Sequence, residues 1–410
     1  MNARIIQGPG RVVVVGAGLA GLRTVDELRH QGYQGELVWL GNEGLHPYDR
    51  PPLSSELMTK PDPVWLAQDL SIDLDALDVT IDLEDAATAL LLDDQQVVGL
   101  RTESGQIDAD AVVVATGATP RRPWAEVAYL HHLRDADRIR TSIGPGRHLA
   151  IIGAGWIGAE LASVGAEAGC TVTVLESGPA PLAQHIGVDA GERTRPWYET
   201  AGIALRTDAE VTTATATSVR FANGTGLDAD LVVAAVGIQP HTRWLAKTVP
   251  LLPTGQIATD RGGATDIAGL WAVGDVARRE SVHFGPINGG HWFSALRDPA
   301  LLATQFLGRP LPANEPAPEV FSDQFGHHLA MLGRLTRPGE PGAAVMMRED
   351  QRGGWTQLHT VGNYLVGAIV VDRPNDASAA RKLLRGASLL QIDLAAAADS
   401  THPLRSIVAS

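Results

Sequence analysis

The sequence contains very little cysteine and lysine. Its 410 residues include one cysteine, Cys170, and three lysines, whereas lysine and arginine together number 33. A single cysteine excludes an internal disulfide, a redox-active Cys-x-x-Cys pair and a four-cysteine iron–sulfur or zinc site. Cys170 stands where a predicted helix leads into a predicted strand, a position that suits a small buried residue. We therefore expect Cys170 to be structural.

Long apolar runs are also absent from the sequence. The best candidate, residues 231–238, is far shorter than the roughly 18–20 residues of a membrane-spanning helix. Residues 1–10 lack an apolar signal core. The formal net charge of −14 disfavours broad binding to nucleic acid. These features predict a cytoplasmic protein of two or three domains that binds neither membranes nor nucleic acid.

A glycine-rich loop follows the first predicted strand. Residues 11–15 are Arg-Val-Val-Val-Val, an apolar run typical of a parallel strand that is covered on both faces. A Gly-x-Gly-x-x-Gly loop follows, formed by Gly16, Gly18 and Gly21, and a helical pattern comes next. In a dinucleotide-binding unit the first glycine allows a tight turn, the second lets the backbone approach a pyrophosphate, and the third lets the helix pack on the strand. The amide groups of the helix N-terminus would face the phosphates.

The same arrangement recurs 137 residues further along the chain. Residues 148–152 form a second apolar strand, and a helical pattern again follows the loop. The three glycines of this loop are Gly153, Gly155 and Gly158. One such loop is weak evidence, because glycine-rich turns are common. Two loops, each between a strand and a helix, predict two bound dinucleotides.

Each unit places polar residues at the end of its next strand, where an adenosine ribose can be bound. These residues are Asn42 and Glu43 in the first unit and Glu176 in the second. A carboxylate at Glu176 accepts from a free 2′-hydroxyl and repels a 2′-phosphate, and no arginine stands among residues 177–181. This favours NADH over NADPH. The alternative is that Glu176 is only a solvated strand end.

Further segments carry a resemblance to a known family. Three strand ends, at residues 112–118, 231–240 and 269–275, follow in the order found in flavoproteins with two dinucleotide-binding domains. The segment Pro-Tyr-Asp-Arg-Pro-Pro-Leu-Ser at residues 47–54 is more specific. It resembles NADH-dependent, FAD-containing ferredoxin reductases of oxygenase systems, of the putidaredoxin reductase and biphenyl dioxygenase ferredoxin reductase type. The resemblance covers essentially the whole chain.

The resemblance implies an α/β fold of the glutathione reductase kind. Two Rossmann-like dinucleotide-binding domains would be followed by a C-terminal α+β interface domain. The FAD-binding domain would comprise residues 1–120 and 246–318, the NADH-binding domain residues 121–245, and the interface domain residues 319–410. A proline-rich stretch at 309–318 indicates a linker.

The resemblance also implies which residues bind the two dinucleotides. Glu160 would contact the nicotinamide amide, with a purely structural carboxylate as the alternative, and Asp275 would accept a hydrogen bond from the flavin ribityl chain. The FAD site would include Gly16, Gly18, Ala20, Gly21, Asn42, Glu43, Arg50, Ser55, Ala87, Ala115, Thr116, Gly117, Arg134, Gly274, Asp275, Trp292 and Phe321. The NADH site would include Gly153, Gly155, Ile157, Gly158, Glu160, Glu176 and Gly237. We expect no metal site, and we expect the His131-His132 and His327-His328 pairs to lie at the surface or in a core.

The sequence departs from the family pattern at several of these positions. Ser55 stands where the family has a lysine that sits by the flavin and pairs with the glutamate at position 160. Glu160 therefore loses its usual partner, and either a neutral Glu160 or a different cation is expected. Phe321 replaces a flavin-facing tryptophan, and Asn42 stands where an aspartate is frequent. FAD binding is expected to be intact, with nicotinamide positioning and electron exit altered.

The implied activity is hydride transfer from NADH to FAD, followed by single-electron transfer to a [2Fe–2S] ferredoxin that serves a P450 or a ring-hydroxylating oxygenase. Residues 320–410 carry nine basic and eight acidic residues, whereas the rest of the chain carries a net charge of −15. An arginine-bearing face could therefore steer an acidic ferredoxin, and scattered solvated arginines are the alternative. The arginines just before this region are Arg278, Arg279, Arg297 and Arg309.

Other functions within the same fold remain open at this point. A rubredoxin reductase is a close sibling that the sequence does not exclude. A flavoprotein redox sensor with slow NADH oxidation, as in the apoptosis-inducing factors, gains from the missing lysine and tryptophan. A peroxide or disulfide reductase is disfavoured, because no cysteine stands near the flavin segments.

Overall fold

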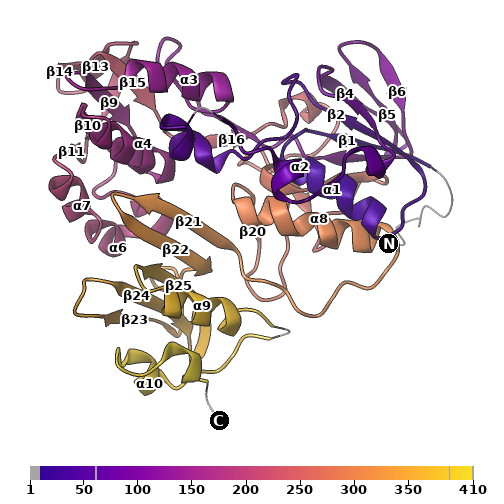
Figure 1. The fold of residues 1–410 in the computed structure, drawn as a ribbon. Helices are drawn as coiled ribbons and strands as arrows, with labels where there is room; N and C mark the ends of the chain where they lie inside the picture. Colours follow the sequence, from indigo (N-terminus) through magenta and orange to yellow (C-terminus); the bar gives the residue numbers. More distant parts are fainter. Residues whose placement is uncertain (1–9, 61, 387, 409–410) are drawn as a thin grey trace.

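The computed structural model describes residues 10–60, 62–386 and 388–408 (Figure 1). Residues 1–9, to which the expectation of no signal core applies, lie outside the described residues. No helix in the described ranges is long and apolar enough to cross a membrane. The chain forms two parallel sheets, one from each glycine-loop unit, and a C-terminal antiparallel sheet.

The first glycine loop follows the central strand of a five-stranded parallel sheet with the order β18-β7-β1-β2-β3. The strands are β1 (Arg11–Val15), β2 (Glu36–Leu40), β3 (Thr80–Asp82), β7 (Ala111–Val114) and β18 (Leu270–Ala272). Alternate valines of β1 enter different cores, because side chains alternate across a strand. Val12 and Val14 pack beneath helices α1 (Leu19–His30) and α8 (Trp292–Phe306).

The opposite face of this sheet is covered by an antiparallel meander. It consists of β4 (Ala87–Asp93), β5 (Gln96–Thr102) and β6 (Gln106–Asp108). Val13 and Val15 pack in one core with Leu90 and Leu100 of this meander. The wholly apolar sequence of β1 follows from this double coverage. A further small sheet contains β17 (Ile257–Thr259), β19 (Ala277–Arg279) and β20 (Ile287–Asn288).

The second unit repeats the architecture of the first. Its parallel sheet has the order β11-β10-β9-β15, formed by β9 (His148–Ile152), β10 (Thr171–Leu175), β11 (Ala204–Arg206) and β15 (Leu231–Ala234). One face is covered by α3 (Leu133–Ser142) and α4 (Trp156–Glu167). The other face is covered by the meander of β12 (Val211–Ala214), β13 (Ser218–Phe221) and β14 (Gly226–Asp228). The predicted strand at residues 148–152 is confirmed.

Two short antiparallel strands connect the parallel sheets. They are β8 (Ala118–Pro120) and β16 (Ile238–Pro240), and Thr119 pairs with Gln239. They lie close to the expected limits of the NADH-binding domain, although those limits stay a prediction. The remaining short helices are α2 (Leu66–Asp69), α5 (Ala183–Ile186), α6 (Val188–Glu192), α7 (Arg195–Thr200) and α10 (Leu394–Ala398).

The C-terminal region is a five-stranded antiparallel sheet with the order β21-β22-β25-β24-β23. Its strands are β21 (Glu319–Gln324), β22 (His327–Gly333), β23 (Ala343–Glu349), β24 (Trp355–Val361) and β25 (Tyr364–Val371). One face packs on α9 (Pro374–Leu383) and the other on α5 to α7 of the second unit. Pro374 stands in the first turn of helix α9, where its missing N–H costs no hydrogen bond. Figure 1 shows the β21–β22 hairpin reaching toward α6 and α7.

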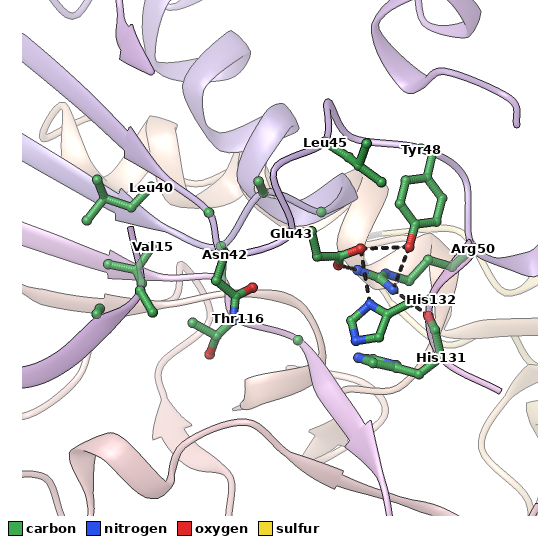
Figure 2. A pocket seen from close by; sticks show the side chains of 18 of the residues that line it. Val15, Leu40, Asn42, Glu43, Leu45, Tyr48, Arg50, Thr116, His131 and His132 are labelled. Atoms are coloured by element: carbon green, nitrogen blue, oxygen red, sulfur yellow. Dashed lines mark hydrogen bonds and ion pairs between the residues drawn. The ribbon is translucent and has the colours of Figure 1, made fainter. Parts of the chain in front are cut away.

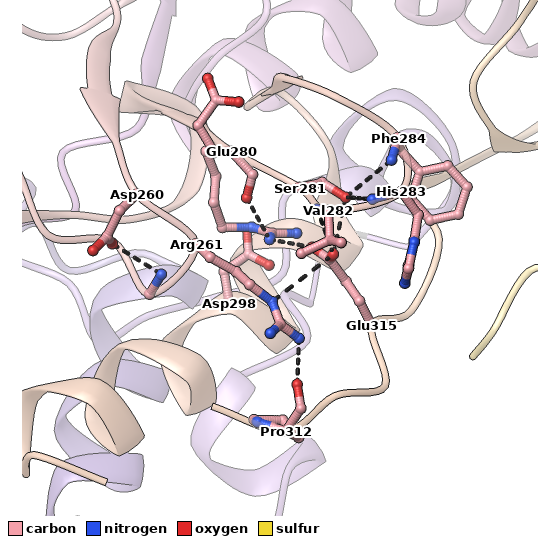
Figure 3. A network of polar contacts seen from close by, with 12 residues as sticks. Asp260, Arg261, Glu280, Ser281, Val282, His283, Phe284, Asp298, Pro312 and Glu315 are labelled. Carbon is pink, nitrogen blue, oxygen red and sulfur yellow. Dashed lines mark hydrogen bonds and ion pairs between the residues drawn. The ribbon is translucent and has the colours of Figure 1, made fainter. Parts of the chain in front are cut away.

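A buried ion pair attaches the proline-rich stretch before β21 to Arg279 at the end of β19 (Figure 3). The side chain of Glu315 is fully buried and pairs with Arg279. The hydroxyl of Ser281 donates to Glu315 at 2.9 Å, and Arg261 lies 3.9 Å from the same carboxylate. Arg279 also lies 3.3 Å from Asp298 and is buried. Arg279 therefore does not belong to the exposed arginine face suggested by the sequence.

We expect Glu315→Gln to lower the free energy of unfolding by about 3 kcal/mol, because breaking a buried ion pair leaves an uncompensated charge. Urea unfolding of the FAD-bound protein, followed by circular dichroism, measures this change. The control is Glu280→Gln, an exposed residue next to Arg279 whose hydrogen bonds are made by its backbone. Equal midpoints for the two variants would contradict a stabilising role for the pair.

Candidate dinucleotide-binding sites

The backbone of the first glycine loop leaves space at one glycine only. A Cβ on Gly16, whose φ is +119°, would lie 2.2 Å from the carbonyl oxygen of Ala115. A Cβ on Gly21 would lie 1.9 Å from the carbonyl oxygen of Gly16. A Cβ on Gly18 would meet no atom within 4 Å. The loop therefore packs tightly at its first and third glycines and presents open space at the second, which fits an approaching pyrophosphate.

A pocket extends from this loop along the carboxyl ends of the strands (Figure 2). Ten of the residues predicted for FAD line it, namely Gly16, Gly18, Asn42, Glu43, Arg50, Ala87, Ala115, Thr116, Gly117 and Asp275. The other predicted residues do not line it, namely Ala20, Gly21, Ser55, Arg134, Gly274, Trp292 and Phe321. Ala20 and Gly274 contact each other behind the loop, and Arg134 is exposed on α3. The FAD role of each residue stays a prediction.

The pocket wall contains residues that the sequence reasoning missed. His131 and His132 are partly exposed and line the pocket, a place that the expectation of surface or core histidines did not single out. Tyr48 also lines the pocket and belongs to the segment at 47–54. The histidines stand just before Arg134, which the resemblance assigns to the FAD site, and that adjacency was the available signal.

Glu43 is the centre of a polar cluster in this wall (Figure 2). It pairs with Arg50, accepts from the hydroxyl of Tyr48 at 2.8 Å, and lies 3.1 Å from Nδ1 of His132. Burial alone would raise the pKa of Glu43, but His132, Arg50 and Tyr48 together lower it to about 2. Burial and the charge of Arg50 lower the pKa of His131 to about 3. The cluster therefore holds an ionised Glu43 beside a neutral His131 at pH 7.

Asp275 lies three residues after the end of β18 and lines the pocket. The N–H of Gly290 donates to its Oδ1 at 2.9 Å. Burial raises the pKa of Asp275, and this hydrogen bond opposes the rise. Trp292, two residues after Gly290, donates its indole N–H to Asp49 at 2.8 Å. Trp292 thereby joins the start of α8 to the predicted FAD-binding segment at 47–54.

The second glycine loop has the same geometry as the first. A Cβ on Gly153 would lie 2.4 Å from the carbonyl oxygen of Ala235, and a Cβ on Gly158 would lie 2.0 Å from that of Gly153. Near Gly155, the only atom within 4 Å of such a Cβ is Nε2 of His185, at 3.8 Å. The space at the second glycine is therefore again open to a pyrophosphate.

Glu176 is tied to the second glycine loop. Its Oε2 accepts from the N–H of Ala154 at 2.8 Å, and its Oε1 accepts from the N–H of Gly178 at 2.7 Å. The alternative of a merely solvated strand end is therefore wrong. Ile157 is 37% exposed in the first turn of α4, and Gly237 has a φ of +95° just before β16.

Glu160 joins three parts of the chain. The hydroxyl of Ser54, from the first unit, donates to its Oε2 at 2.5 Å, and the hydroxyl of Ser322, from the C-terminal sheet, donates to its Oε1. Within the described ranges, no arginine or lysine lies within 4 Å of the Glu160 carboxylate. Burial raises its pKa, and the two hydroxyls oppose the rise. Glu160 is thus bonded by Ser54 and not by Ser55, the residue at the position of the family lysine.

Comparisons with known proteins agree with this architecture. Residues 10–288 match the model of the pyridine nucleotide-disulphide oxidoreductases, and residues 320–408 match a reductase C-terminal domain. The chain belongs to this oxidoreductase family. The predicted family resemblance and fold are confirmed, and so is the prediction of an oxidoreductase that uses FAD and NADH.

Relatives of this oxidoreductase include electron-transfer components. The biphenyl dioxygenase system ferredoxin–NAD(+) reductase component of Paraburkholderia xenovorans is 28% identical over 362 residues, which cover 84% of this chain and 85% of the relative. The crystal structure of a protein named Fdr9 is 34% identical, with a TM-score of 0.85 and coverage of 96% and 99%. The covalent putidaredoxin reductase–putidaredoxin complex is 25% identical, with a TM-score of 0.87 and coverage of 98% of both chains.

The single cysteine distinguishes this oxidoreductase from the disulfide chemistry in its family name. Cys170 is half-buried, and its sulfur accepts from the N–H of Gly144 at 3.1 Å. One thiol cannot form a redox-active disulfide within the chain. Electrons that leave a flavin in this oxidoreductase must therefore go to an outside acceptor.

We expect Glu176→Gln to reduce the preference of the oxidoreductase for NADH over NADPH by about tenfold, which corresponds to about 1.4 kcal/mol. The amide keeps an acceptor oxygen but no longer repels a 2′-phosphate. The measurement is kcat/KM for both nucleotides with an artificial electron acceptor. The control is Glu199→Gln, an exposed carboxylate on α7. An unchanged ratio in Glu176→Gln would refute a role in choosing the nucleotide.

We expect Glu160→Ala to slow reduction of the flavin by NADH by about 100-fold, because misplacing a reacting ring by about 1 Å has this effect. Single-turnover absorbance measures the rate, and the FAD content shows that the first site remains intact. Glu167→Ala, an exposed carboxylate on the same helix, is the matched control. A normal rate in Glu160→Ala would support the alternative of a purely structural carboxylate.

Proposed function

We propose that this protein is an FAD-dependent NADH:ferredoxin oxidoreductase that supplies electrons to a P450 or a ring-hydroxylating oxygenase in the cytoplasm. The observation that carries the proposal is the presence of two open glycine loops in a chain whose single cysteine cannot relay electrons. Relatives named as ferredoxin–NAD(+) reductase components support a ferredoxin as the acceptor. FAD, when bound, accepts a hydride from NADH and releases electrons one at a time.

The residues divide this work between the two units. The loop at Gly18 and the cluster around Glu43 hold FAD, and Asp275 faces its pocket. The loop at Gly155 and the carboxylate of Glu176 hold NADH. Glu160 lies where both units meet the C-terminal sheet, and it orients the nicotinamide against the flavin.

We further propose that the acceptor is an acidic [2Fe–2S] ferredoxin that docks beside Phe321. The ring of Phe321 is 37% exposed at the start of the C-terminal sheet. Arg297 and Arg381 flank the buried Glu319, at 3.7 and 2.5 Å. Burial lowers the pKa of Arg297, and the neighbouring charges of Arg385 and Arg381 lower it further. Two arginines thus share one carboxylate, with Arg385 as a further positive charge close to Arg297, and this excess positive charge favours an acidic partner.

A stopped-flow experiment tests the proposed function. We expect anaerobic NADH to bleach the flavin within seconds, and we expect reduction of cytochrome c to depend on added [2Fe–2S] ferredoxin. Raising the ionic strength shortens the Debye length and should slow the ferredoxin-dependent step. Slow bleaching with a long-lived charge-transfer band would instead support a redox sensor. Salt-independent reduction of ferredoxin would contradict the arginine docking face.

Rubredoxin is the second candidate acceptor. The rubredoxin–NAD(+) reductase of Pseudomonas putida is 27% identical over 346 residues, which cover 79% of this chain and 86% of the relative. The same assay with rubredoxin in place of ferredoxin separates the two functions. A larger kcat/KM with rubredoxin would replace the ferredoxin assignment.

A further inference from the structure

A short segment after β10 is attached to the second glycine loop. The N–H of Leu182 donates to the carbonyl oxygen of Ala154 at 3.0 Å, and α5 begins at the next residue. Leu182 has a φ of +56°, in the left-handed region that a leucine rarely adopts. Strained backbone of this kind persists only where the surroundings enforce it, and it clusters at functional sites. The strained turn directs α5 across the glycine loop.

His185 lies over the loop as a result. Its Nε2 is 3.8 Å from the point where a Cβ on Gly155 would stand, and no other non-adjacent atom of the described residues comes within 4 Å of that point. The imidazole ring lies 5.5 Å from the ring of Trp156. Within the described ranges, neither ring nitrogen of His185 has a hydrogen-bond partner. The ring is therefore placed beside the open space at Gly155 with free polar atoms.

The groups that act on His185 come from two other elements. His185 is exposed as a residue, but the protein packed around its ring desolvates the imidazole and lowers its pKa, and the carboxylate of Glu176, after β10, opposes this. Burial, with a contribution from His185, lowers the pKa of His291 to about 4, and His291 precedes α8. His185 is therefore neutral at pH 7, and His291 does not titrate between pH 6 and 8.

We propose that His185 donates a hydrogen bond to the pyrophosphate of NADH and takes up a proton from solvent when the dinucleotide binds. This inference rests on the use of NADH in the proposed function. The second glycine is where a pyrophosphate approaches the backbone, and Nε2 is the side-chain nitrogen nearest that point. The negative pyrophosphate favours the charged imidazole, so the complex holds more protons than the free protein. Affinity should therefore fall as pH rises from 6 to 8.

The test measures binding of NAD⁺ and of ADP-ribose to the FAD-bound protein by isothermal titration calorimetry. We expect His185→Ala to weaken both ligands by about tenfold at pH 6, because a hydrogen bond to a charged group is lost. ADP-ribose carries the pyrophosphate but no nicotinamide, so an equal effect assigns the contact to the pyrophosphate. Wild-type protein should also take up part of a proton at pH 6.5, as shown in buffers of different ionisation enthalpy.

Two further variants separate the contact from folding and from general loss of a histidine. His185→Gln keeps an uncharged donor, so it should restore much of the affinity at pH 8 and abolish proton uptake. His30→Asn, at the exposed end of α1, is the matched control and should change neither quantity. FAD content and circular dichroism establish that each variant is folded.

Several outcomes would overturn the inference. Normal affinity of His185→Ala for both ligands would remove the contact altogether. Weakened NAD⁺ binding with unchanged ADP-ribose binding would move the contact to the nicotinamide half. Proton uptake that survives in His185→Gln would assign the proton to another group. Failure of the wild-type protein to bind either ligand is a separate result, which would overturn the proposed function as well.

Discussion

The direct packing of backbone on backbone at the two glycine loops is the constraint on which the structure depends. At Gly21 and Gly158 the helix lies so close to the preceding turn that a single added carbon would overlap a carbonyl oxygen. This contact fixes the direction of α1 and α4 relative to their sheets, and it points the first amide groups of each helix at the open space beside Gly18 and Gly155. Both dinucleotide sites therefore follow from the absence of side chains at four positions.

The three parts of the chain meet at a carboxylate that has no cation beside it. Glu160 receives hydroxyl groups from Ser54 and Ser322, which belong to different sheets. A lysine at this place would compensate the charge of Glu160, whereas two hydroxyls leave its pKa raised by burial. The two hydrogen bonds therefore connect the three parts of the chain at Glu160. Unlike a lysine, they add no positive charge beside the carboxylate. This is the main respect in which the site departs from the family pattern.

The C-terminal sheet contributes to both ends of the proposed electron path. Ser322 of β21 reaches Glu160, while Phe321, the preceding residue, is partly exposed and packs against Phe293, over whose ring Arg297 lies. Neighbouring residues of a strand point to opposite faces, so one strand can serve the interior junction and the outer surface together. The buried pair of Glu315 and Arg279 holds the segment that leads into this strand. The position of β21 therefore depends on a contact made before the sheet begins.

The sequence by itself determined the two loops, the strands around them and the family, because these features are local patterns and each loop stands between a strand pattern and a helix pattern. The glycines at 16 and 153 are examples, since both need a positive φ. Only the tertiary structure decided which hydroxyl meets Glu160, that His131 and His132 line the pocket predicted for FAD, and that His185 lies over Gly155. These contacts join residues far apart in the chain, or depend on one strained turn, and no local spacing encodes the direction of a side chain across such a distance.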